Sequence, residues 1–210
     1  MEARRKEMRR ALLVTIFVVG GATLCLFMQS GRAGIVGSAH DFSSMGWSGG
    51  EICKPCHAPH NAAMPSNEFR APLWNHAVTN ATFTVYSSAT TNATIGQPTS
   101  GSKLCLSCHD GTVALDSFGG ATGSVMISGN KNLGTNLSND HPISFTYDTA
   151  LSLADGELYD PATTPGVNTL LRGGKVQCSS CHDAHNTPNQ PKLLQKSNAA
   201  SALCLTCHKK

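Results

Sequence analysis

The sequence is short of the residues that usually build a large hydrophobic core. Aromatic residues make up 6% and charged residues 14% of its 210 positions, and patterns that start a helix are few. A chain with so few large side chains needs another source of apolar volume. We therefore expect sparse regular secondary structure and an interior filled by something other than side chains.

A broad basic surface is also missing. Residues 1–33 hold six of the 16 basic residues and two of the 13 acidic ones, so ten basic and eleven acidic residues remain in the rest of the chain. Proteins that bind nucleic acid usually carry a basic patch or stripe. The balance of charge therefore excludes nucleic acid as an expected partner.

The first 33 residues resemble an export signal in composition. A basic start is followed by 18 apolar positions, ALLVTIFVVGGATLCLFM, which is the order of a secretory signal peptide. We predict a signal peptide over 1–33 with cleavage after Ala33, and a secreted protein at the cell surface or outside the cell. An uncleaved membrane anchor is the alternative, because 18 apolar residues just reach across a bilayer.

Every cysteine except Cys25 lies in a C-x-x-C pair followed at once by histidine. C-x-x-C-H is the attachment motif of haem c: the two thiols bond to one edge of the porphyrin, and the imidazole of the next residue binds the iron. We predict four covalently attached haem c groups. The four motifs are Cys53/Cys56/His57, Cys105/Cys108/His109, Cys178/Cys181/His182 and Cys204/Cys207/His208.

Zinc sites and disulfides are the other common uses of paired cysteines. Zinc is bound by C-x-x-C pairs, and exported proteins often carry disulfides. Neither use explains a histidine at the same place four times. After the predicted signal peptide no cysteine lies outside the motifs, which also argues against a disulfide framework.

The motifs alternate between two kinds, in the order A, B, A, B. Kind A reads C-x-x-C-H-x-x-H-N, at 53–61 and 178–186, and kind B reads L-C-L-[S/T]-C-H, at 104–109 and 203–208. This order indicates a duplicated two-haem unit. We predict one tetrahaem domain, residues 34–210, made of two unequal dihaem units at roughly 34–120 and 121–210.

The expected fold is mostly irregular and rich in loops, with few short helices, short β-strands and the haems as its core. Alternating or β-rich runs predict strands at 81–88, 124–128 and 143–148. Ser197 is a candidate cap for one or two helical turns that lead into the fourth motif.

Each haem iron takes two axial ligands, and the histidines of the four motifs supply one each. Five histidines remain as candidates for the second position: His40, His60, His76, His141 and His185. His60 and His185 hold the same place in the two kind A motifs, and each suits a neighbouring haem. His40 and His141 both precede a kind A motif, whereas His76 has no counterpart and is the best candidate for a spare.

Histidine ligands on both faces of every iron would leave no open position for a substrate. We therefore expect an electron-transfer protein without catalytic residues. Two alternatives stay open: a soluble periplasmic tetrahaem carrier, and a small multihaem reductase in which one iron is open.

The pairing of C-x-x-C-H-x-x-H-N with LCLSCHDG, together with LWNH and NDHPISF, resembles the multihaem c-type cytochromes with doubled C-x-x-C-H motifs. The chain after residue 33 resembles the OmcE-type tetrahaem cytochromes of metal-reducing bacteria. The resemblance implies head-to-tail filaments of stacked bis-histidine haems, in which one histidine, by our preference His60, ligates a haem of the next subunit. It also implies outer-membrane cytochrome conduits as donors, and metal oxides or other extracellular acceptors.

Overall fold

The computed structural model describes residues 34–60, 62 and 72–209. The chain divides into two compact units, Met1–Arg32 and Ala33–Lys210, and the described residues belong to the second. The predicted signal peptide lies outside them. Within the described part, no helix is both long and apolar enough to cross a membrane.

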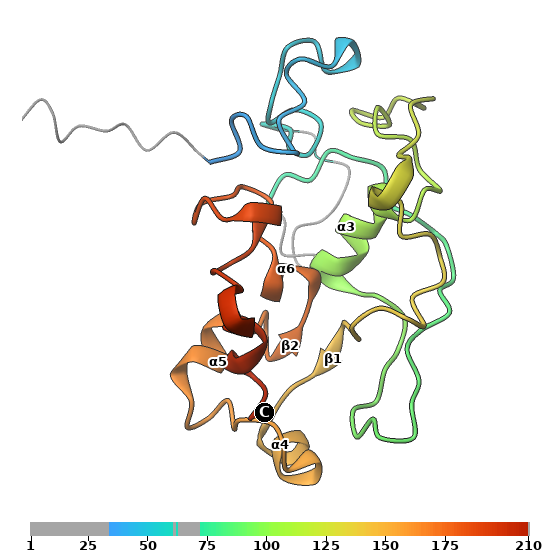
Figure 1. The fold of residues 1–210 in the computed structure, drawn as a ribbon. Helices are drawn as coiled ribbons and strands as arrows, with labels where there is room; N and C mark the ends of the chain where they lie inside the picture. The colour runs from blue at the N-terminus through green and yellow to red at the C-terminus, as the bar shows by residue number, and fades with distance from the viewer. Residues whose placement is uncertain (1–33, 61, 63–71, 210) are drawn as a thin grey trace, which may run out of the picture. The chain divides into compact units, whose positions relative to one another are not determined.

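Regular secondary structure is sparse, and most of the chain in Figure 1 is loop. The α-helices are α3 (Ser100–His109), α4 (Thr149–Asp155), α5 (Pro165–Leu170) and α6 (Cys178–Cys181), and the strands are β1 (Phe145–Thr146) and β2 (Lys175–Val176). Single 3-10 turns lie at Gly46–Ser48, Gly129–Lys131, Pro191–Leu193, Ala199–Ser201 and Cys204–Thr206. The loop-rich fold expected from the composition is confirmed.

The centre of the unit brings two motifs together. Strands β1 and β2 pair antiparallel, with Phe145 opposite Val176, and β2 leads through one residue into α6. Helix α6 packs against α3, beside which it lies in Figure 1. Because α3 ends with the second motif and α6 contains the third, this packing places the two motifs side by side.

A buried polar network joins α3 to α6. Ser102, on α3, accepts a hydrogen bond from the backbone N–H of Cys178 at 2.9 Å and donates one to the side-chain oxygen of Gln177. Ser144 donates to the same oxygen at 3.0 Å. Gln177 in turn caps α6, because its backbone N–H donates to the hydroxyl of Ser180 at 2.9 Å. Helix α6 has only four residues and is thus stabilised by hydrogen bonds with Ser102 and with its capping residue Gln177.

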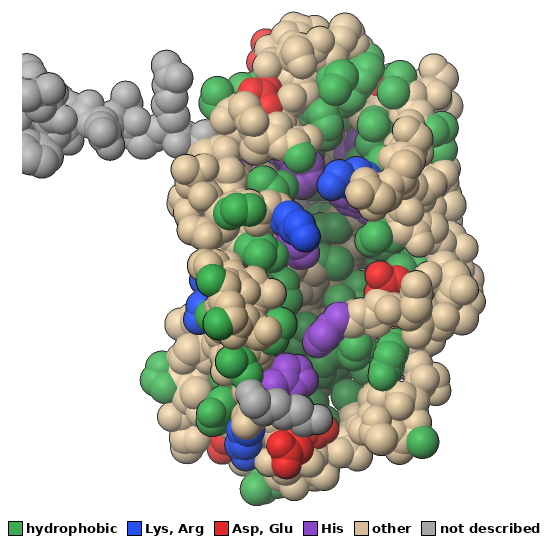
Figure 2. All heavy atoms as spheres, viewed as in Figure 1, with side chains coloured by type: hydrophobic (Ala, Val, Ile, Leu, Met, Phe, Trp, Pro, Cys, Tyr) green, Lys and Arg blue, Asp and Glu red, His purple; other side chains and the backbone are tan. Residues whose placement is uncertain are grey.

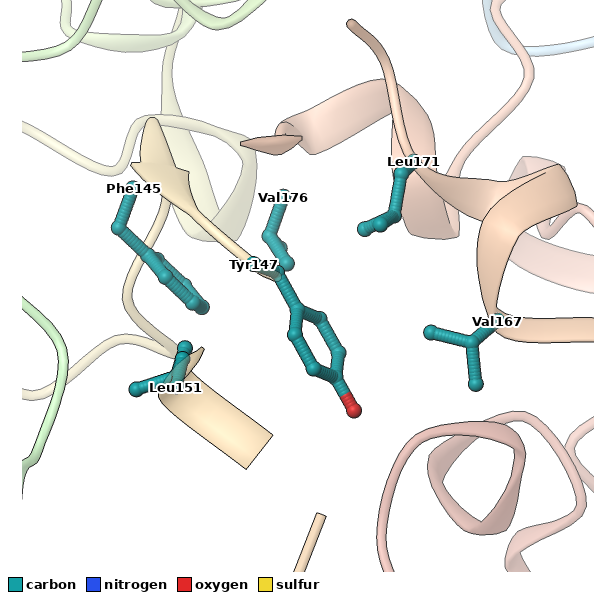
Figure 3. Close-up of a cluster of buried hydrophobic side chains, with 6 residues drawn as sticks. All are labelled: Phe145, Tyr147, Leu151, Val167, Leu171 and Val176. Carbon is teal, nitrogen blue, oxygen red and sulfur yellow. The ribbon is translucent and has the colours of Figure 1, made fainter. Parts of the chain in front are cut away.

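One hydrophobic cluster lies beside the fourth motif (Figure 3). Its buried members come from β1, β2, α4, α5 and the adjoining loops: Phe145, Tyr147, Leu151, Val167, Leu171 and Val176. Cys207 packs against this cluster, and the hydroxyl of Tyr147 donates to the carbonyl of Tyr159 at 2.7 Å. The backbone N–H of Tyr159 donates to the carbonyl of Cys207 at 2.8 Å. The cluster therefore fixes the fourth motif to the loop that follows α4.

A second cluster lies beside the second motif. Phe83, Leu106 and Leu137 are buried together, and Leu106 is only 1% exposed. Leu205 holds the same place in the other kind B motif but is 41% exposed. Two motifs with nearly the same sequence thus differ in what their middle leucine contacts.

We expect Leu106→Ala to lower the free energy of unfolding of the haem-loaded protein by about 2–5 kcal/mol, because it leaves a cavity in a packed cluster. The matched change Leu205→Ala is expected to alter it by less than about 0.5 kcal/mol. Urea unfolding followed by near-ultraviolet circular dichroism measures both. Equal losses in the two variants would contradict the difference in burial.

Two predicted strands are wrong, because side chains occupy the place of a partner strand. In 81–88, the side-chain amide of Gln97 accepts a hydrogen bond from the backbone N–H of Phe83 and donates one to its carbonyl, both at 2.8 Å. Within this run only Thr84 makes a β-bridge. In 124–128, the carboxylate of Asp116 accepts two backbone N–H groups at 2.8 Å. The prediction at 143–148 is confirmed by β1.

The turns before the fourth motif are shorter than an α-helix. Ser197 does accept a hydrogen bond from the backbone N–H of Ala199, at 3.2 Å. Ala200 and Ser201, however, have positive φ angles of 50° and 61°, which lie outside the right-handed helical region. The result is two separate 3-10 turns, Ala199–Ser201 and Cys204–Thr206.

Candidate haem sites

Each C-x-x-C-H motif folds as a single helical turn. The histidine N–H donates to the carbonyl of the first cysteine at 2.8 Å in the first motif, 2.9 Å in the third and 3.0 Å in the fourth, while the second motif is the last part of α3. Residues three and four positions apart share one helical face. The two thiols and the imidazole of each motif therefore point to the same side, as haem attachment requires.

A backbone carbonyl orients the imidazole in three of the motifs. In each case the Nδ1 atom lies within hydrogen-bonding distance of a carbonyl from a later segment. The contacts are His57 to Pro72 at 2.8 Å, His109 to Lys131 at 2.8 Å and His182 to Lys192 at 3.0 Å. A carbonyl can only accept, so the hydrogen is on Nδ1 and the lone pair is on Nε2, which is the form that binds a metal.

Three imidazole pairs have the separation that a shared metal requires. The ring centres of His57 and His185 lie 6.1 Å apart, those of His40 and His109 also 6.1 Å, and those of His141 and His208 6.4 Å. Two imidazoles that bind one metal on opposite sides, each with its nitrogen about 2 Å from the metal, place their ring centres roughly 6 Å apart. Each pair joins one motif histidine to one histidine outside the C-x-x-C-H pattern.

The pairs follow the sequence duplication. His40 and His141, the two histidines that precede a kind A motif, each lie opposite the kind B histidine of their own unit. His185 lies opposite His57, so the kind A motif of the second unit supplies the partner for the first. Among the four motif histidines, all of which the structure describes, His182 alone has no ring pair of this kind.

The other two candidate ligands lie apart from these pairs. His60 is exposed, just after the first motif. His76 is 2% exposed, and both of its ring nitrogens lie near backbone carbonyls, Ala77 at 2.7 Å and Ala114 at 3.0 Å. The structure thus places three of the five candidates opposite a motif histidine and two elsewhere.

The motif thiols differ in exposure: Cys53 and Cys204 are exposed, and the other six are partly buried. The eight cysteines in the described residues are free of disulfide bonds. Burial raises the pKa of Cys56 to about 11 and that of Cys108 to about 12. Such an environment disfavours the thiolate and suits side chains that end as neutral thioethers.

Successive motifs lie close to one another. A hydrogen bond joins the thiols of Cys105 and Cys178, which raises the pKa of Cys105 and lowers that of Cys178. Burial is the first cause of the raised pKa values of Cys108 and Cys181, and in each case a thiol of a neighbouring motif adds to the rise. These neighbours are Cys56 and Cys204, respectively. The four sites therefore form a row in chain order.

Other features of the surface around the motifs also suit haem c. Figure 2 shows histidine side chains along a hollow in one face, with hydrophobic side chains in its walls. Two buried donors, the side-chain nitrogens of Trp74 and Gln177, lack a hydrogen-bond partner among the described residues. Buried donors are rarely left unpaired, and the propionates of a haem are acceptors that could pair with them. The thiols, imidazoles, apolar walls and spare donors together suit this group.

Sequence reasoning missed the segment that orients His57. Pro72 supplies the carbonyl for its Nδ1, Trp74 forms a β-bridge with it, and Asn75 binds the loop of the first motif. The sequence marked His76 as a candidate ligand but did not mark Pro72 or Trp74. Their contacts with His57 are made by backbone atoms, which any residue type supplies.

Comparison with known families gives one match. Residues 170–210, which contain the third and fourth motifs, match the family described as "Doubled CXXCH motif". A comparison with curated proteins gives no match. The family match and the geometry of the four motifs support a multihaem c-type cytochrome with covalently bound haem c, a class whose members generally carry electrons.

Proposed function

We propose that the chain is the subunit of an extracellular, OmcE-type filament that carries electrons along a row of four haems in each copy. One observation carries the proposal: three motif histidines have a second imidazole opposite them within the chain, whereas His182 lacks one. A second copy of the chain can supply the missing ligand.

Paired imidazoles favour electron transfer over catalysis. A haem held in each site supplies one-electron oxidation and reduction of its iron. With a haem bound, His40, His141 and His185 would each supply the second ligand opposite a motif histidine, which would leave substrates no open coordination position there. The carbonyls that accept from Nδ1 of His57, His109 and His182 would orient these rings so that Nε2 can bind a metal, and would raise its basicity.

The duplicated sequence points to the histidine that crosses between copies. His185, at the end of the second kind A motif, lies opposite His57 of the preceding unit. His60 has the same place in the first kind A motif, and the unit that precedes it belongs to the previous copy. By the same rule, His60 of one copy binds the iron held by His182 of the previous copy.

This arrangement makes an open polymer. The donor and the acceptor are different surfaces, the segment around His60 and the site of His182, so the contact is heterologous. A heterologous contact that does not close into a ring propagates as a fibre. His60 is exposed, as a ligand that reaches into another copy must be.

The proposed location is outside the cell, reached through the predicted signal peptide at 1–33. The proposed partners are further copies of the chain, outer-membrane cytochrome conduits that donate electrons, and metal oxides or other extracellular acceptors. Support for these partners comes from the sequence resemblance and from the row of four sites.

Electron microscopy of the purified, haem-loaded protein tests the proposal, together with difference spectra taken under carbon monoxide. We expect fibres in which no iron binds carbon monoxide, and dissociated chains in which one iron in four binds it. Single particles in which no iron binds carbon monoxide would support a soluble carrier instead. Particles that bind carbon monoxide and reduce nitrite would support a reductase.

A further inference from the structure

His76 is enclosed in a way that does not suit an axial ligand. The side chain is 2% exposed. Its Nδ1 lies 2.7 Å from the carbonyl oxygen of Ala77, and its Nε2 lies 3.0 Å from that of Ala114. Backbone acceptors thus stand at both ring nitrogens, whereas an axial ligand needs one nitrogen free of such an acceptor.

The ring instead touches the attachment point of the second haem. The Nε2 atom of His76 lies 3.5 Å from the sulfur of Cys108. The backbone on either side is also fixed to the loop after the second motif: His76 forms a β-bridge with Phe118, and the N–H of Ala77 donates to the carbonyl of Ser117 at 2.8 Å. His76 is therefore part of the wall of the second site.

The residues just before His76 make hydrogen bonds to the first C-x-x-C-H motif. The carbonyl of Pro72 binds Nδ1 of His57 at 2.8 Å. Asn75 donates its backbone N–H to the carbonyl of Cys56 at 2.9 Å and its side-chain N–H to the carbonyl of Lys54 at 2.7 Å. Segment 72–76 thus contacts the first haem site at one end and the second at the other.

We propose that His76 is a positioning residue that joins the first two haem sites and holds an N–H dipole beside the thioether of Cys108, rather than an axial ligand. This inference deepens the proposed electron-transfer function, because the separation of neighbouring haems and the potential of each are what the protein controls.

An N–H group places the positive end of its dipole near the second haem. That charge stabilises the reduced state, which holds one more electron than the oxidised state. Removing the N–H is therefore expected to lower the reduction potential of one haem in four and to leave the axial ligands unchanged.

The test compares His76→Phe, which has no donor, with His76→Gln, whose amide nitrogen can take the place of Nε2. We expect as many low-spin irons in electron paramagnetic resonance spectra of both haem-loaded variants as in those of the wild type, and no binding of carbon monoxide beyond that of the wild type. Spectroelectrochemistry should show one potential lowered in His76→Phe and returned toward the wild-type value in His76→Gln.

The matched control is His40→Gln, which changes the imidazole opposite His109 at the same haem. It should convert one iron in four to a form that binds carbon monoxide. The same conversion in His76→Gln would identify His76 as a ligand and overturn the proposal. Unchanged potentials in His76→Phe would also overturn it, and if that variant does not assemble, His76→Gln still decides between ligand and positioning residue. These readings concern irons within one chain, so they stand apart from the outcome of the filament test.

Discussion

His60→Ala is expected to abolish fibres and to leave one iron in four with a single imidazole. The reason is that, in the proposed filament, His60 of one copy supplies the ligand that the site of His182 lacks within its own chain. Loss of a metal–ligand bond at a repeated contact removes the same contact from every junction of the polymer. Electron microscopy and carbon monoxide difference spectra of the haem-loaded variant measure the two effects.

The matched control is His185→Ala, which removes the same residue of the other kind A motif. It should also open one iron in four, at the site of His57, but fibres should persist because this pair lies within one chain. Added imidazole should close the open iron in both variants and restore fibres in neither. Fibres that form normally from His60→Ala would contradict the crossing ligand.

The local parts of the haem sites could be predicted from the sequence because they depend on short spacing. Two cysteines three positions apart and a histidine directly after the second share one face of a helical turn, and all four motifs form that turn. The duplication also grouped His40 with His141, which lie in equivalent places opposite His109 and His208. Spacing and repetition carry this information without tertiary structure.

The remaining features depend on contacts that have no sequence pattern. The carbonyls of Pro72, Lys131 and Lys192 orient motif histidines, and any residue could supply a carbonyl at these places. Gln97 replaces a partner strand through its side chain, which an alternating pattern cannot reveal. Leu106 and Leu205 have nearly the same neighbours in sequence but differ in burial, because Leu106 packs against Phe83 and Leu137.

A chain made without haem is expected to remain unfolded. The two clusters of buried hydrophobic side chains in the described residues are small, six members beside the fourth motif and three beside the second. The strands have two residues each, and α6 has four. Elements this short are not stable alone, so the order of the loops depends on the groups that the thiols and imidazoles hold.

Expression in cells that lack the haem attachment machinery provides the chain for this test, and the haem-loaded protein is the control. Hydrogen exchange should show protected amides throughout the loaded protein and almost none in the haem-free chain. Cys204→Ala combined with Cys207→Ala should give an intermediate result. Amides around Tyr147 and Val167 should lose protection because their cluster packs against Cys207, while those around Leu106 keep it. A haem-free chain that melts cooperatively would show that side chains alone specify the fold. The haems would then bind to a structure that is already folded and would not form its core.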